Sequence, residues 1–263
     1  LGRGADAASS FGFGDAITTT ATTEELSHAA YVAGRLWVEE PEKDAPAVEA
    51  GKRLVVVGDP PFDGRTAFRF CMSALSATDR LFGAAPEAAR ESFTFFLVPE
   101  PGLGRAHDGA SLTRSLGLWF DPRRGLDAGI RLTVAHELVH RWLGGAVRLV
   151  EDDGRDAVWF SEGFTVHFAR RVLLDAGRAT PADLLVDIRR MLGEPPAGEE
   201  QLPLDYRRGG TWAAFFDAAL RRASGGARSL DDVARELVAR ARDERAARLP
   251  VAALREILAR DLG

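Results

Sequence analysis

Residues 131–167, RLTVAHELVHRWLGGAVRLVEDDGRDAVWFSEGFTVH, contain the motif around which the rest of the chain is organised. Within them His136, Glu137 and His140 form an H-E-x-x-H motif. Residues four apart on a helix lie on one face, one turn above the other, so both imidazoles can reach a single ion. Glu137 is displaced by about 100° around the helix axis, where it can contact a water on that ion. This pattern is typical of a zinc hydrolase.

The residues beside this motif are nearly all apolar, which favours a buried helix. The alternative is an exposed helix that carries two unrelated histidines. Polar side chains in a buried helix need hydrogen-bond partners or a metal. Asp127 is the expected N-cap of the helix, and Gly144 with Gly145 is its expected end.

A third ligand is expected from the segment W-F-S-E-G-F-T, which contains Glu162. This glutamate begins a second apolar-periodic segment, with Ser161 as the expected N-cap and Gly177 as the expected end. The helix dipole favours a carboxylate in the first turn. The sequence therefore predicts one Zn²⁺ ion, with water in the fourth position, whose ligands are His136, His140 and Glu162.

These residues resemble two families of zinc peptidases. Residues 136–145, HELVHRWLGG, are similar to the zinc helix of the aminopeptidase N family, whose pattern is H-E-x-x-H-x-W-x-G. Residues 158–165, VWFSEGFT, resemble the third-ligand helix of the glycyl-aminopeptidase family, which is often found with PDZ domains. Both are gluzincins, in which one helix supplies two histidines and a second supplies a glutamate. The resemblance implies a thermolysin-like catalytic domain.

The spacing between the two helices departs from both families. The 21 residues between His140 and Glu162 exceed the usual aminopeptidase N spacing and fall short of the longer glycyl-aminopeptidase loop. The extra residues are expected in the polar turn at 151–156. The likeness covers roughly residues 53–237.

The resemblance also implies a role for Tyr206. The segment Y-R-R-G that it begins is similar to Y-x-K-G, whose tyrosine donates a hydrogen bond to the oxyanion. A phenol suits this task because it donates while neutral at pH 7. The alternative is a tyrosine at a helix start that packs on the core.

Residues 108–113, DGASLT, occupy the place of the G-A-M-E-N motif of aminopeptidase N relatives. Gly109, Ala110 and Ser111 are expected to offer strand backbone to an extended peptide. Leu112 stands where the family has the glutamate that binds the free α-amino group of the substrate. An apolar side chain cannot pair with an ammonium ion. We therefore expect blocked or internal bonds to be cleaved at least as well as bonds next to a free amino terminus. The alternative is an ordinary strand start without substrate contact.

Composition sets broad limits on the class of protein. With 263 residues, 46% of them hydrophobic, the chain can form one large domain or two modest ones. The net charge of -5 gives no indication of binding to nucleic acid or to an acidic membrane. No apolar run is long enough for a membrane span. Cys71 is the one cysteine and is expected in the core. Because one cysteine cannot form an intrachain disulfide, the sequence does not indicate whether the protein is in an oxidising or a reducing compartment.

Residues 1–51 are interpreted as the remnant of an N-terminal β domain; a self-sufficient small β unit is the alternative. The first ten residues are rich in Gly, Ala and Ser and are expected to be flexible. Short strands are predicted at 11–14, 17–20 and 31–38, with a brief helix from a capping box at Thr22. Because the chain starts at Leu1 without a signal pattern, a processed or truncated product is expected.

Residues 52–263 are predicted to form the catalytic domain with a C-terminal helical lobe. Buried strands are expected at 53–58, 93–98 and 112–120, and a helix at 65–82. The remainder is predicted to be helical, with helix starts at Thr180, Asp205, Ser229 and Pro250. Strands first and helices after them indicate an α+β fold.

The remaining histidines carry no ligand spacing. His28 and His107 are expected on the surface. His167 lies five residues past Glu162, on a different helix face, and is expected in the core or behind the ligands.

The predicted reaction is hydrolysis of a bond in a peptide or protein substrate. Glu137 takes a proton from the zinc-activated water and passes it to the leaving amine, and the oxyanion is held by zinc and Tyr206. Two rivals stay open: a non-catalytic peptide-binding module on a metallopeptidase fold, and a zinc esterase or epoxide hydrolase. The sequence leaves the oligomeric state open, and it is equally consistent with an exported or a cytoplasmic location.

Overall fold

The computed structural model describes residues 5–14, 16–84, 90–104, 107–194 and 201–263. The chain forms two compact units. The first comprises residues 1–76 and 84–138, and the second comprises residues 77–83 and 139–263. One division, between residues 76 and 77, falls inside helix α2 (Gly64–Phe82), and the others fall just after α2 and at the end of α4 (Ala128–Val139).

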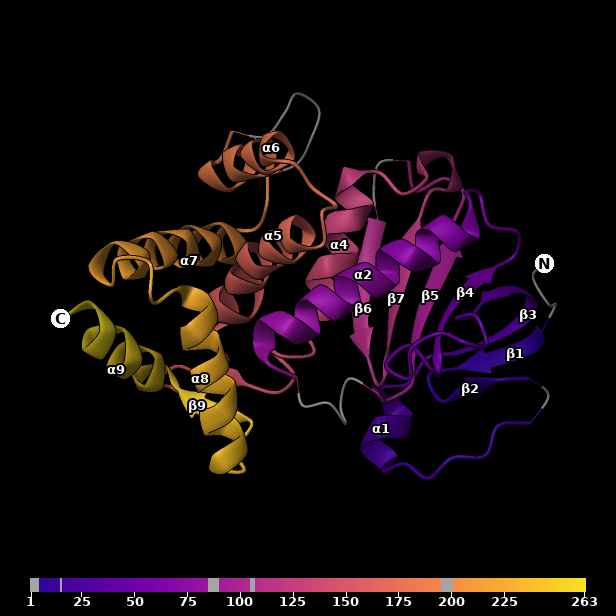
Figure 1. Ribbon diagram of the computed structural model, residues 1–263, viewed down its shortest axis with the longest axis horizontal. Coiled ribbons are helices and arrows are strands. Elements are labelled where there is room, and N and C mark those ends of the chain that lie inside the picture. The colour runs from indigo at the N-terminus through magenta and orange to yellow at the C-terminus, as the bar shows by residue number, and fades with distance from the viewer. Residues whose placement is uncertain (1–4, 15, 85–89, 105–106, 195–200) are drawn as a thin grey trace. The chain divides into compact units, whose positions relative to one another are not determined.

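A mixed sheet is the framework of the first unit. Its strands are β1 (Ala5–Ser9), β2 (Gly12–Phe13), β3 (Tyr31–Glu39), β4 (Lys52–Val57), β5 (Phe93–Pro99), β6 (His107–Leu112) and β7 (Ser115–Phe120). They are ordered β2-β1-β3-β4-β5-β7-β6, and Figure 1 shows β4, β5, β7 and β6 side by side. The pairs β4–β5 and β5–β7 are parallel and the others are antiparallel. This order makes β6 an edge strand.

Each of the central strands β4 and β5 contains a continuous apolar run. Residues 54–56 of β4 and 95–97 of β5 are almost fully buried. Strands in parallel register are typically covered on both faces, which explains why these segments read as continuous hydrophobic runs rather than alternating ones. The parallel pairs therefore form the core of the first unit.

Short helices complete this unit beside α2 and α4. Helix α1 (Thr23–Ser27) begins with the predicted capping box, in which Thr22 and Glu25 bond each other's backbone amides. A 3₁₀ turn, η1 (Pro122–Arg124), follows β7 and leads to α4.

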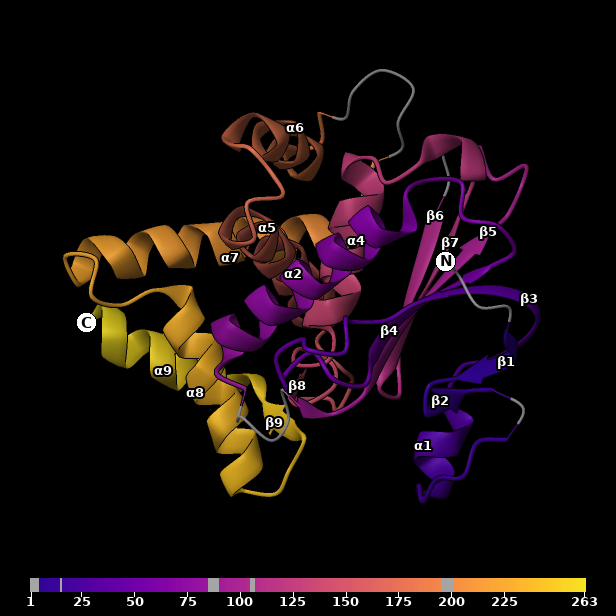
Figure 2. The ribbon, with the colours of Figure 1, turned by 45° about the vertical axis from the view of Figure 1, so that its right-hand side comes forward.

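The second unit is mainly helical. Its elements are β8 (Arg148–Val150), the π-helix η2 (Trp159–Phe164), α5 (Thr165–Asp175), α6 (Pro181–Leu192), α7 (Leu204–Ala223), α8 (Leu230–Asp243), β9 (Arg248–Pro250) and α9 (Val251–Leu262). Helix α7 packs against η2, α5 and α6, and α9 lies against α7 and α8 (Figures 1 and 2). Within the described ranges, no helix is both long and apolar enough to cross a membrane.

Most predicted elements are confirmed, but the N-terminal region differs. Residues 5–9 form a strand where flexibility was expected, because β1 is held between β2 and β3 by backbone pairing that small side chains do not oppose. Residues 17–20, a β-branched run, form no strand, since no neighbouring strand pairs with them in the described chain. The parallel pair β8–β9 was not predicted, and only β9 lies in the region predicted to be helical.

The domain boundary predicted between residues 51 and 52 does not coincide with the division of the two units. Strand β3 pairs with β4 along residues 36–39, so the N-terminal strands belong to the same sheet as the strands of the predicted catalytic domain. The interpretation of residues 1–51 as the remnant of another domain stays a prediction.

Candidate metal centre

Helix α4 positions the first histidine as its local sequence predicts. The side chain of Asp127 accepts a hydrogen bond from the backbone amide of Ile130 at 3.0 Å, which confirms Asp127 as the N-cap. The apolar residues Ile130, Val134, Ala135 and Leu138 are fully buried. Burial of this stripe fixes the rotation of the helix and leaves His136 half-buried.

His140 begins the turn that follows α4, earlier than the expected stop at the two glycines. Its Nδ1 lies 3.0 Å from the backbone oxygen of Leu143. A carbonyl oxygen can only accept, so Nδ1 carries the proton and Nε2 presents its lone pair. This is the arrangement that orients a metal-binding imidazole.

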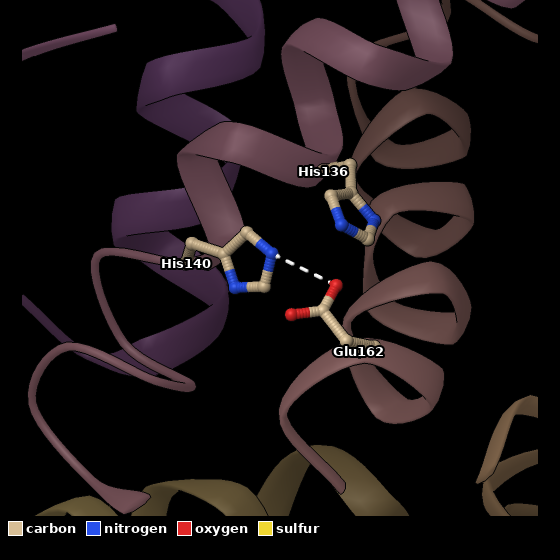
Figure 3. Close-up of side chains that lie close together, drawn as sticks. All are labelled: His136, His140 and Glu162. Carbon is tan, nitrogen blue, oxygen red and sulfur yellow. Dashed lines mark ion pairs between the residues drawn. The ribbon is translucent and has the colours of Figure 1, made fainter. Parts of the chain in front are cut away.

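The third candidate ligand lies opposite this lone pair. The Nε2 atom of His140 is 3.3 Å from Oε2 of Glu162, and Figure 3 shows the carboxylate pointing toward both imidazole rings. One ligand atom from each of His136, His140 and Glu162 lies within 4.8 Å of the other two.

These residues fit a zinc ion. Ligand atoms at about 2.1 Å from a tetrahedral zinc are about 3.4 Å apart, close to the 3.3 Å between His140 and Glu162. Two imidazoles and one carboxylate are also the donor set of several catalytic zinc sites, which keep one position open.

The helix that carries Glu162 differs from its prediction. Glu162 lies inside the π-helix η2, which begins at Trp159, so Ser161 is not the N-cap. The N-cap is Val158, which makes no side-chain capping bond. π-Helical turns are often found at functional sites because they redirect side chains.

Glu137 is nearly buried and contacts the edge strand β6. A Cβ atom on Gly109 would lie 2.7 Å from Cγ and 2.9 Å from Oε1 of Glu137. Only a glycine therefore lets the backbone of β6 approach this carboxylate so closely. Ser111 shares the strand face of Gly109, and Ala110 takes the other face. The structure brings Gly109 next to the predicted base.

His107 is not the surface residue that was expected. It is half-buried at the start of β6, and its Nδ1 accepts a hydrogen bond from Arg124 Nη1 at 2.7 Å, because a guanidinium only donates. Arg124 also holds Asp127, with nitrogen–oxygen distances of 2.7 and 2.9 Å. No spacing in the sequence signals this contact, whereas the exposed position of His28 was predicted.

Backbone contact joins the elements that carry Glu162 and Tyr206. A Cβ atom on Gly209 of α7 would lie 1.7 Å from the backbone oxygen of Trp159, and one on Gly163 would lie 2.4 Å from Cα of Gly209. Tyr206 is half-buried in the first turn of α7, three residues before Gly209. The N-terminal end of α7 is therefore packed directly on η2.

His167 is half-buried on α5 and, as predicted, lies outside the group of candidate ligands. Its Nε2 has no hydrogen-bond partner in the part of the chain that the structure describes. Burial lowers the pKa of His167 to about 4; the charge of Asp217 opposes this shift and the neighbouring arginines add to it. His167 is therefore neutral at pH 7.

Comparisons with known proteins support the fold. No family model and no curated protein matches the chain. The chain is similar to the crystal structure of an aminopeptidase N family protein from Idiomarina loihiensis, with 18% identity and a TM-score of 0.65, over 81% of this chain and 42% of that one. Native yeast LTA4 hydrolase shows 15% identity and a TM-score of 0.49 over 81% of this chain and 34% of its own, a likeness too weak to argue from.

The first likeness confirms the predicted α+β class and agrees, in fold alone, with the resemblance to the aminopeptidase N family. The chain spans less than half of the length of either structure. Fold similarity does not establish activity, which depends on the residues of the site.

Proposed function

We propose that this chain is a zinc-dependent peptidase that hydrolyses peptide bonds. The observation that carries the proposal is the 3.3 Å separation of His140 Nε2 and Glu162 Oε2, with His136 completing the group of candidate ligands. Glu137, between the two histidines in the sequence, supplies a carboxylate that a purely structural metal site would not need.

His136, His140 and Glu162 would hold the ion. When bound there, zinc lowers the pKa of a coordinated water toward about 7 and polarises the substrate carbonyl. Glu137 accepts the proton of the attacking water and delivers it to the leaving amine. The phenol of Tyr206 donates a hydrogen bond to the carbonyl oxygen as its negative charge develops.

Peptides are the proposed substrates because an edge strand passes the proposed base. Strand β6 has β7 on one side and ends the sheet on the other, so its free edge can pair with an extended peptide. Gly109 places the backbone of that strand against Glu137. Ala110 and Ser111 continue the same edge. A peptide paired with β6 would present its main chain to the base.

The name of the structural neighbour suggests an aminopeptidase, but Leu112 argues for another specificity. Leu112 occupies the position from which a glutamate would bind the substrate's free amino group. Burial of an ammonium ion without a partner costs several kcal/mol. Two acidic residues are already engaged: Asp108 accepts a hydrogen bond from the amide of Gly109, and Asp156 pairs with Arg248. We therefore propose cleavage of blocked or internal bonds at least as readily as amino-terminal ones.

The test compares one peptide series, free or acetylated at its amino terminus, with the parent chain and a Glu137→Gln variant. We expect both series to be cleaved at similar rates by the parent, and neither by the variant, which keeps its zinc. Parent-like cleavage by Glu137→Gln would exclude the proposed base. A preference of about 100-fold for free peptides, about 2.7 kcal/mol, would exclude our interpretation of Leu112.

A further inference from the structure

A cavity lies within the second unit. It has a volume of about 810 Å³, and neither His140 nor Glu162 lines it. The acidic turn at residues 151–156, η2, α7 and α9 form its walls. This volume is in the range of pockets that bury small ligands or several side chains of a peptide, roughly 300–1,000 Å³.

The floor of this groove is aromatic and aliphatic. The rings of Trp159 and Trp212 are 5.1 Å apart and nearly perpendicular, and Leu254 and Leu258 of α9 also line the groove. The indole nitrogen of Trp159 donates to Glu151 Oε1 at 2.6 Å, so its polar atom is satisfied within the protein. The floor is therefore suited to an apolar side chain rather than to a polar group.

The rim of the groove is net negative. Five carboxylates and three guanidinium groups line it. Arg155 is paired with Asp153 at 2.6 Å, and Arg208 lies over the ring of Trp212 at 5.3 Å. Asp152 is exposed and makes no ion pair within the described residues. Charge complementarity favours a ligand that carries a lysine or arginine.

The groove is built on the elements that carry the proposed catalytic residues. Trp159 lies three residues before Glu162 on η2, and Arg208 lies two residues after Tyr206 on α7. The close contact of η2 with α7 at Gly209 joins these segments rigidly. The groove and two of the proposed zinc ligands, His140 and Glu162, therefore belong to the same structural unit.

We propose that this groove binds a segment of the peptide substrate in which a basic side chain adjoins an apolar or aromatic one. The proposal rests on the proposed peptidase function. The apolar side chain contacts the rings of Trp159 and Trp212, and the basic side chain pairs with the carboxylates of the rim, Asp152 among them. The groove increases the affinity for longer substrates by contacting a segment that does not include the cleaved bond.

Fluorescence anisotropy tests this inference without turnover, in the Glu137→Gln variant of the full chain. The probe is the blocked peptide Gly-Ser-Lys-Leu-Lys-Phe-Gly-Ser with fluorescein at its amino end, and the matched probe has glutamate at both lysine positions. We expect the lysine probe to bind at least about tenfold more tightly. Added to Glu137→Gln, Asp152→Lys should weaken that binding by about fivefold and strengthen binding of the glutamate probe.

Two further variants separate the groove from general charge effects. Trp212→Ala should weaken binding of both probes by about tenfold, because it removes one of the three aromatic side chains that line the groove. Asp243→Lys makes the same charge change at an exposed position of α8 outside the groove and should leave both affinities unchanged. Circular dichroism confirms that each variant is folded.

Equal affinity for the two probes, or the same loss in Asp243→Lys as in Asp152→Lys, would overturn the inference. Failure of the peptidase proposal has a separate result: the parent chain would cleave no peptide, whether or not the lysine probe binds in the groove. If binding follows the groove variants but no peptide is cleaved, the groove is a peptide site and the link to catalysis is wrong.

Discussion

Substitution of Gly209 by alanine tests whether the contact between α7 and η2 holds the two sides of the site in place. The new methyl carbon would lie 1.7 Å from the backbone oxygen of Trp159 and 2.9 Å from Cα of Gly163. Real Cβ atoms essentially never approach closer than 3.0 Å, so the two backbones must separate by more than 1 Å. Because both neighbours are backbone atoms, no side-chain rotation can relieve the clash.

The size of the effect follows from two opposing contributions. Overpacking of a closely packed contact costs about 1–3 kcal/mol, and a backbone clash belongs at the upper end. Alanine is favoured over glycine inside a helix by about 1 kcal/mol. We therefore expect Gly209→Ala to lower the free energy of unfolding by about 2 kcal/mol. Displacement of Glu162 from Tyr206 by about 1 Å should slow peptide cleavage by about 10²-fold.

Gly210→Ala is the matched control on the same helix. Its methyl carbon would meet Met191 Sδ at 2.4 Å, which is the end of a flexible side chain that can rotate away. Urea unfolding followed by circular dichroism, with turnover measured below the transition, compares the two variants. We expect the control to stay within about 1 kcal/mol of the parent and to keep its activity. If the two variants match in stability and turnover, the reasoning about this contact is refuted.

Two further predictions concern single side chains. Tyr206→Phe should slow turnover by about 10²- to 10³-fold with little change in KM, because only the hydrogen bond to the oxyanion is lost; a parent-like rate would exclude that role. For His167, burial lowers the pKa to about 4, from 6.5 in the unfolded chain. The unfolded state therefore binds the proton first, and the free energy of unfolding should fall by about 3 kcal/mol between pH 6.5 and 4. The urea midpoint should fall less between pH 6.5 and 4 in His167→Leu than in the parent. An equal fall in both would show that protonation of His167 does not cause the loss of stability.

The parts of the fold that were predicted correctly depend on local signals. The capping box at Thr22, the N-cap Asp127 and the apolar stripe of α4 are read within a few residues, and the structure contains each of them. Strands β8 and β9 have three residues each, and their paired residues are 100 positions apart in the sequence, so no local pattern predicts them. Strand β1 has weak β propensity and is held by its neighbours.

The candidate site shows the same division between local and tertiary information. Helical spacing brings His136 and His140 to one face, and the start of a second apolar-periodic segment marks Glu162, so the group of candidate ligands was predictable. The π-helical start at Trp159, in place of a cap at Ser161, accompanies backbone contact with Gly209, which is distant in sequence. The approach of Gly109 to Glu137 likewise depends on strand pairing.

Zinc binding by the three proposed ligands is the central claim, and chelator competition measures it most directly. The parent chain and the variants His140→Ala, Glu162→Ala and His28→Ala are each titrated with zinc against a chromophoric chelator. His28 is exposed on the first unit and serves as the control. We predict one tightly bound zinc per chain in the parent and in His28→Ala, and no tight site in the other two. Stoichiometric zinc retained with parent-like affinity in both His140→Ala and Glu162→Ala would contradict the account.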